Sequence, residues 1–324
     1  MALLIDEPGL QSTVQDLGRP GHYNVGIPLS GAMDTLSHEI ANLWVGNDPT
    51  LATIECTYTA PKFTVTEPTT MAVAGATMEV AVNGENVPQW TSVALAEGDS
   101  VTCGFATAGT RAYLAFSGGV DVPRVLDSRS TYSLGKIGGH QGRALAAGDT
   151  VSIGAPTKDG AVRELADELR PEFSRAITAR VVLGLYDHLL TAESIDMLTT
   201  TEWKLTPVAD RTGLRFSGDQ KFEFADRTQP FGAGSNPSNI VDAGYAMGSI
   251  QIPGGSQPIV LHRDAVSAGG YAMVATVISS DMDAVAQLAP GSTAVFESVS
   301  IDEAVAARAE RTKRRNKIHE SLTT

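Results

Sequence analysis

Polar residues that could bind a ligand are concentrated between Gly248 and Met282. Two predicted β-strands flank a Gly-Pro turn there, and their ends carry Gln251, His262, Arg263 and Asp264. The pair Gly269–Gly270 follows, and glycines let a backbone approach a ligand without a Cβ in the way. This spacing favours a ligand site at the hairpin. It fits equally well a hairpin whose glycines serve turn geometry and whose charges are solvated.

A second group of polar residues lies on a loop near the N-terminus. A run of Gly and Pro between residues 18 and 21 forces a turn, and this turn holds Gln15, Asp16 and Arg19. Loops of this kind carry function in many proteins, and ordinary turns share their composition. Beyond the loop, Asp34 suits the N-cap of a helix that Gly46 ends.

Arginines on predicted turns form a third group: Arg19, Arg111, Arg124, Arg129, Arg143, Arg211 and Arg215. The segments Ser128–Thr131 and Asp210–Arg211 place guanidinium groups beside hydroxyls and a carboxylate. A guanidinium binds a carboxylate through two parallel hydrogen bonds, so these arginines are candidates for gripping a carboxylated substrate. Each could equally form an ion pair inside the fold. Only convergence in one cleft would separate the two interpretations.

The elements that must position these residues are mostly short strands. Thirty-two Gly and 16 Pro with only 6% aromatic residues favour strands joined by tight turns, a mainly β protein with a few helices (α+β). Asn83–Gly84 between alternating apolar residues predicts a hairpin. A glycine turn that feeds an apolar strand recurs at residues 95–101, 145–151 and, more loosely, 288–293, so two related β domains are expected. The predicted divisions are 1–155, a linker at 156–175 and 176–324.

Helices are predicted at four further places. A short acidic one runs from Val162 to Leu169 in the linker, and another begins near Thr191. Residues 282–288 are expected to be helical with caps from Ser279 to Asp281. The pair Ser300 and Glu303 forms a capping box that opens the last helix. That helix ends in a cluster of Arg and Lys, which predicts a solvated, fraying tail rather than a docking element.

Composition excludes several classes of function. A net charge of −13 disfavours binding to nucleic acid or to an anionic membrane, and no window approaches the roughly 18 apolar residues of a membrane span. Two cysteines and a start without a signal peptide indicate a soluble, cytoplasmic protein. The six histidines lack metal-ligand spacing, so no metal site is predicted. Gly135–Lys136 is followed by Ile137, which leaves no phosphate loop, and no Met-Lys-Met biotin-attachment sequence occurs.

Several motifs taken together resemble the allophanate hydrolase subunit 2 family. This is the KipA or PxpC group, also described as biotin-dependent carboxyltransferase-like proteins. The motifs extend in order over nearly the whole chain: Ser12–Gly21, Ile27–Asp34, Ala41–Asn42 with Val45–Asn47 and Glu55, Ser128–Thr131, Asp210–Arg211 and Gly248–Tyr271. The resemblance implies two cyclophilin-like β-barrel domains.

The resemblance also implies an activity and partners. A chain of this kind joins a KipI or PxpB type subunit (allophanate hydrolase subunit 1) and a PxpA type subunit in a heteromeric, ATP-dependent 5-oxoprolinase, a hydrolase that cleaves a small lactam. ATP would bind with help from the partner subunit. One alternative is a carboxyltransferase of the urea carboxylase type, which moves CO2 from carboxybiotin to a urea-like acceptor. Another is a noncatalytic KipA-like protein that binds a kinase inhibitor.

On the preferred interpretation, a cleft between two barrels binds a small amide or carboxylated substrate. Gln251 and the Gly269–Gly270 backbone would orient it, and Tyr271 would close the wall. Arg129 and Arg211 would stabilise an anion or carboxylate, and Asp264 would act as an acid–base or positioning group. The opposing side would come from the first domain, through Asp16, Arg19 and Asp34.

The chain departs from the family pattern at several of these motifs. Val266 stands where the family has Gln, and Ser267 stands where it has Thr. Asp127 replaces a Gly, and Thr212 replaces a Met. The loss of Gln at 266 removes a hydrogen-bond donor and acceptor that could hold an amide or ureido substrate.

Overall fold

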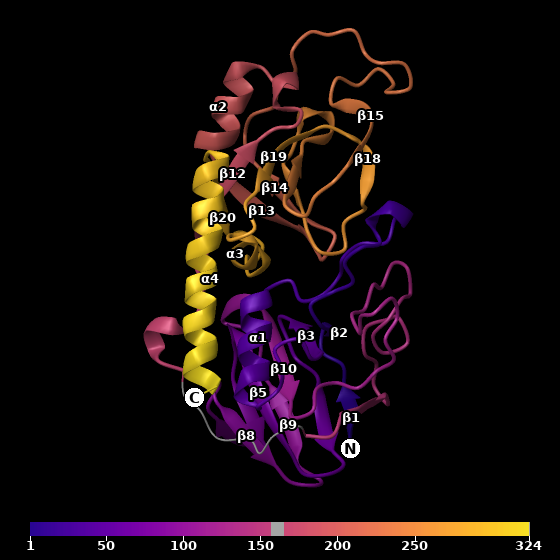
Figure 1. The fold of residues 1–324 in the computed structure, drawn as a ribbon, viewed down its shortest axis with the longest axis vertical. Helices are drawn as coiled ribbons and strands as arrows, with labels where there is room; N and C mark the ends of the chain where they lie inside the picture. The colour runs from indigo at the N-terminus through magenta and orange to yellow at the C-terminus, as the bar shows by residue number, and fades with distance from the viewer. Residues whose placement is uncertain (157–164, 324) are drawn as a thin grey trace. The chain divides into compact units, whose positions relative to one another are not determined.

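The computed structural model describes residues 1–156 and 165–323, and these form two compact units (Figure 1). Unit 1 consists of Met1–Arg19, Ser30–Phe173 and Thr312–Thr324, and unit 2 of Pro20–Leu29 and Ser174–Arg311. Strands dominate both units, so the expected mainly β fold with a few helices is confirmed. The assignment of Pro20–Leu29 to unit 2 and of the C-terminal segment to unit 1 has no counterpart in the sequence pattern.

Unit 1 is built from two sheets. The larger has the order β11-β1-β4-β9-β6-β7, and the smaller has the order β2-β3-β10-β5-β8. Their bounds are β1 (Ala2–Glu7), β2 (Gln11–Gln15), β3 (Thr53–Thr57), β4 (Lys62–Val65), β5 (Thr69–Thr77), β6 (Val80–Val82), β7 (Glu85–Val87), β8 (Ser92–Leu95), β9 (Ser100–Cys103), β10 (Ala108–Phe116) and β11 (Thr150–Ser152). The expected hairpin joins β6 and β7, where Asn83 and Gly84 both have positive φ.

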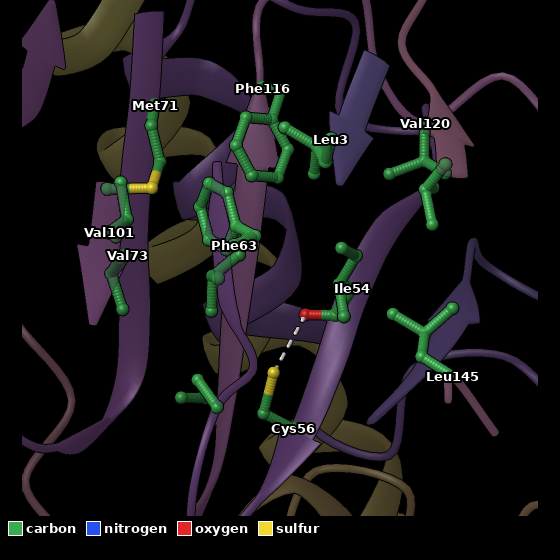
Figure 2. Close-up of a cluster of buried hydrophobic side chains, with 14 of the residues drawn as sticks. Leu3, Ile54, Cys56, Phe63, Met71, Val73, Val101, Phe116, Val120 and Leu145 are labelled. Atoms are coloured by element: carbon green, nitrogen blue, oxygen red, sulfur yellow. Dashed lines mark hydrogen bonds between the residues drawn. The ribbon is translucent and has the colours of Figure 1, made fainter. Parts of the chain in front are cut away.

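The core of unit 1 is packed by side chains from both sheets (Figure 2). The rings of Phe63 and Phe116 meet edge to face with centroids 5.6 Å apart. Strand β5 is buried on both faces: Met71 and Val73 join this core, whereas its small Ala residues pack against helix α1 (Thr35–Trp44). Truncation of a buried Phe of this kind to Ala costs about 3–5 kcal/mol.

The recurring glycine turn is the same device in both units. Gly98, Gly148 and Gly291 have positive φ, and the N–H of each donates to a neighbouring strand at 2.8 Å. The next side chain closes the turn: Asp99 and Asp149 each accept from a backbone N–H three residues earlier at 2.7 Å. The sequence echo therefore marks a turn geometry and feeds β9, β11 and β20 (Thr293–Ser298).

The basic end of the last helix differs from the expected fraying tail. Helix α4 (Ile301–Thr323) remains helical to its end, and Ile318 and Leu322 are fully buried in the second core of unit 1. Arg315 Nε donates to Glu39 Oε2 at 2.6 Å, and His319 Nε2 lies 3.0 Å from the same oxygen. The prediction of a solvated tail is wrong because two apolar residues four apart bury one face of the segment.

Unit 2 contains a closed barrel in the order β12-β19-β16-β17-β14-β13-β20. The bounds of its remaining strands are β12 (Ala176–Leu183), β13 (Glu202–Ala209), β14 (Gly213–Ser217), β16 (Ser249–Gln251), β17 (Ile259–Leu261) and β19 (Met273–Val277). A separate two-stranded ribbon, β15 (Asn239–Gly244) with β18 (Ala268–Tyr271), accompanies it. The helices are α2 (Ala192–Thr200) and α3 (Met282–Ala286).

Helix capping follows the sequence at three of four ends. The side chains of Asp34, Thr191 and Ser300 accept from the first turns of α1, α2 and α4. At α3 the N-cap Asp281 makes no capping bond, because its carboxylate instead accepts from Arg180 at 2.6 Å and 3.0 Å. The linker helix predicted from Val162 to Leu169 lies partly outside the described residues, and its described end forms a single 3-10 turn at Asp167–Leu169.

Candidate functional site

A pocket of about 410 Å³ lies on the outer face of the unit 2 barrel. Along β14 the buried Leu214 and Phe216 alternate with Gly213 and Arg215, so the latter two face outward. The expected hairpin of β16 and β17 supplies Gln251 and Ile259 to the same pocket. The barrel therefore contributes a floor made from three neighbouring strands.

Strand register places two polar side chains on either side of one apolar residue. Arg215 pairs with Ile259 across β14 and β17, and Gln251 pairs with Ile259 across β16 and β17. Directly paired residues share a face of the sheet. Because adjacent strands are about 4.8 Å apart, the Cα atoms of Arg215 and Gln251 are about 10 Å apart across this row.

The β15–β18 ribbon forms the facing wall. Gly269, Gly270 and Tyr271 of β18 line the pocket together with Tyr245 and Val266. The Tyr245 hydroxyl donates to Tyr271 O at 2.9 Å and accepts from Tyr271 N at 2.7 Å, and burial raises the pKa of Tyr245. A Cβ at position 269 would lie 3.0 Å from the Tyr245 ring, so glycine there makes room for that ring.

Two donors that line this pocket make no hydrogen bond of standard geometry among the described residues. Gln251 is 6% exposed, and its buried Nε2 is one of them. The buried Nε of Arg215 is the other. The Asp210 carboxylate at the pocket edge is engaged in its own turn, where Oδ1 accepts from Thr212 N at 2.7 Å and Gly213 N at 3.1 Å. The arrangement can bind a small ligand that offers hydrogen-bond acceptors.

Asp264 and Arg211 form a buried ion pair beside the pocket and do not line it. Arg211 Nε donates to Asp264 Oδ2 at 2.7 Å and Nη2 to Oδ1 at 3.1 Å, and each side chain is 7% exposed. Asp264 N also donates to Arg211 O at 2.8 Å, which ties the loop after β17 to the turn before β14. This geometry supports a positioning role for the pair.

The predicted residues of unit 1 form a separate cluster around Asp16. Its carboxylate accepts from Ser128 Oγ at 2.7 Å, Ser130 Oγ at 2.5 Å and Arg129 N at 2.6 Å. The Arg129 side chain donates to Val122 O at 2.8 Å and to Asp121 at 2.6 Å, and the buried Arg19 donates to Ser130 O. These contacts fold the Ser-Arg-Ser-Thr segment onto the N-terminal loop.

Asp34 serves the start of α1, where it accepts from Ser37 N at 3.0 Å and Ser37 Oγ at 2.6 Å. A buried network continues beyond it: Asp34 N donates to the Tyr113 hydroxyl, which donates to Glu55 Oε2 at 2.8 Å. Neighbouring His38 is fully buried, and burial lowers its pKa to about 4.

The structure thus brings Gln251, Gly269, Gly270 and Tyr271 together in one pocket, as the hairpin pattern predicts. Tyr245 and the outward position of Arg215 go beyond the predicted site. Arg215 belongs to the arginine set of the sequence, and the alternation along β14 indicates its face. The pairing of β14 with β17, which decides its neighbour, is nonlocal and has no sequence signal.

The chain belongs to the family described as the carboxyltransferase domain, subdomain A and B, whose model matches residues 25–298. It is 33% identical to the C-type subunit of 5-oxoprolinase from Escherichia coli over 308 residues, which cover 94% of this chain and 94% of that protein. It is also 33% identical to the urea amidolyase of Saccharomyces cerevisiae over 310 residues, covering 93% of this chain and 17% of that protein. The resemblance to the KipA or PxpC group is confirmed.

Solved structures agree with these matches. The urea amidolyase of K. lactis superposes with a TM-score of 0.91 at 32% identity, over 98% of this chain and 20% of that one. The urea carboxylase of Kluyveromyces lactis gives the same TM-score of 0.91 and 32% identity, over 100% of this chain and 30% of that one. The chain therefore corresponds to one part of these longer enzymes.

Two features bear on metal and membrane binding. Residues 1–156 and 165–323 hold no group of three His, Cys, Asp or Glu side chains arranged to bind a metal ion. In the same residues, no helix combines the length and apolar character needed to cross a membrane.

Proposed function

We propose that this chain is the C-type subunit of a heteromeric, ATP-dependent 5-oxoprolinase and that the unit 2 pocket binds the lactam substrate. The observation that carries the proposal is the reciprocal coverage: the match spans 94% of this chain and 94% of the E. coli 5-oxoprolinase chain. Against the urea amidolyase of S. cerevisiae the match spans only 17% of the relative. A KipI or PxpB type subunit and a PxpA type subunit are the proposed partners.

The pocket supports binding and orientation of a small amide. The unpartnered Gln251 Nε2 would donate to the lactam carbonyl oxygen, which polarises the carbonyl for attack. The Gly269–Gly270 backbone allows close approach, and Tyr271 closes the wall. The Arg211–Asp264 pair holds the adjoining loops in place. ATP is proposed to bind with the help of the partner subunits.

The test is 5-oxoproline-dependent ATP hydrolysis by the chain mixed with both partner subunits. The complete set should hydrolyse ATP when 5-oxoproline is present, and omission of this chain should abolish the stimulation. Gln251→Leu should lower kcat/KM for 5-oxoproline by about tenfold or more, because one buried hydrogen bond to the substrate is lost. An absence of stimulation in a complete, co-purifying set would overturn the proposal.

A carboxyltransferase is the second candidate, favoured by the family description and by the TM-score of 0.91 to urea carboxylase. In that case the chain would move a carboxyl group from carboxybiotin, made by a separate carboxylase and carrier, to a urea-like acceptor. Transfer of labelled carbonate from carboxybiotin to urea in the presence of this chain would support it. Carboxybiotin decay that no acceptor accelerates would remove it.

A further inference from the structure

The two unpartnered donors of the unit 2 pocket differ in what they can recognise. Gln251 Nε2 is a neutral amide donor that is nine-tenths buried, whereas Arg215 carries a permanent positive charge. A buried polar group without a partner is unfavourable unless a ligand or water satisfies it. Because both groups line the same pocket, one ligand can satisfy them together.

The register of the barrel fixes where each end of such a ligand would bind. Arg215 and Gln251 stand on the same face, one on each side of Ile259. Ile259, Leu261 and Val266 supply apolar surface between and around them. A ligand for this row therefore has an anionic group at one end, a carbonyl group at the other and a short apolar middle.

We propose that Arg215 is the carboxylate-binding residue of this pocket and selects small carboxylic acids that carry an amide or lactam. The inference rests on the proposed function and deepens it, because 5-oxoproline has both a ring lactam and a carboxylate. A guanidinium matches a carboxylate with two hydrogen bonds. The amide of Gln251 presents a donor for the lactam carbonyl and an acceptor for the lactam N–H. A neutral ligand such as urea leaves Arg215 without a counter-charge.

Calorimetric binding to the full chain, alone and with its partner subunits, tests this role. The probes are 5-oxoproline, 2-pyrrolidinone, which is the same lactam without the carboxylate, and urea. The wild-type chain should bind 5-oxoproline at least about tenfold more tightly than 2-pyrrolidinone, since charged hydrogen bonds are the difference. Arg215→Met should lower the affinity for 5-oxoproline to that for 2-pyrrolidinone and leave the latter unchanged.

Two further variants separate this role from a structural one. Gln251→Leu should weaken both lactams, because the group it loses contacts the part they share. Arg124→Met removes an exposed arginine of unit 1 as the matched control and should change neither affinity. Thermal unfolding of each variant checks that the fold is retained, and Arg215→Lys, which keeps the charge but loses the planar fork, should fall between wild type and Arg215→Met.

The outcomes are distinct from those for the proposed function. Equal affinity of the wild type for 5-oxoproline and 2-pyrrolidinone, equal losses for both in Arg215→Met, or no binding of any probe to the chain or its complex would overturn the inference. If 5-oxoproline-dependent ATP hydrolysis persists with an unchanged KM in Arg215→Met, the proposed function stands and the role of Arg215 falls. If the binding pattern holds without any ATP hydrolysis, the reverse applies.

Discussion

Removal of one partner of the Arg211–Asp264 pair should destabilise unit 2 strongly. The two side chains are each 7% exposed and are joined at 2.7 Å, so Asp264→Ala leaves a buried guanidinium without its carboxylate. Such an uncompensated buried charge costs about 3–5 kcal/mol. Replacement of both partners, in Arg211→Met/Asp264→Leu, removes the two charges together and should cost less than about 1 kcal/mol. The coupling energy between the sites should thus be at least about 3 kcal/mol.

Urea unfolding followed by tryptophan fluorescence measures these changes, since Trp203 is fully buried in unit 2. The exposed pair of Arg129 with Asp121, which is 55% exposed, provides the control, and Asp121→Ala should cost less than about 1 kcal/mol. If Asp264→Ala unfolds within about 1 kcal/mol of wild type, the positioning role is refuted. Asp264 would then be available for acid–base chemistry.

Three other predictions concern individual residues. Burial lowers the pKa of His38 to about 4, below the ordinary value of about 6.5, so its contribution to stability is present above pH 6.5 and is lost as the pH falls toward 4. The loss should reach about 2 kcal/mol by pH 5, and His38→Gln should flatten it in urea titrations across this range. Leu126 and Asp127 both have positive φ in a two-residue turn, so Leu126→Asn/Asp127→Gly should raise unfolding stability by about 1 kcal/mol, and an unchanged midpoint would contradict the strain argument. Gly269→Ala brings a methyl group to 3.0 Å from the Tyr245 ring and should raise KM for the lactam more than it lowers the melting temperature, which steady-state kinetics with calorimetry can check.

Local features of the fold could be predicted from the sequence because a few neighbouring residues determine them. The Asn83–Gly84 hairpin and the caps of α1, α2 and α4 depend on side chains within three residues of the element. The cap of α3 could not be predicted, because Arg180, about a hundred residues earlier, takes the Asp281 carboxylate. The burial of Ile318 likewise depends on a core formed by distant strands.

The candidate site divides along the same line. Gln251, Gly269 and Tyr271 lie within one hairpin and its continuation, so their sequence proximity indicated a shared site. The partner of Asp264 was not predictable, because Arg211 is 53 residues away and the adjacent Asp210 offered a nearer carboxylate. The neighbour of Arg215 depends on strand order in a closed barrel, which residue spacing does not encode.

The most direct test of the central claim is a crystal structure of the full chain soaked with 5-oxoproline. Density for the ligand in the unit 2 pocket, with its carboxylate on Arg215 and its lactam carbonyl within hydrogen-bond distance of Gln251 Nε2, is the predicted result. Density for the ligand elsewhere in the chain, with this pocket empty, would contradict it.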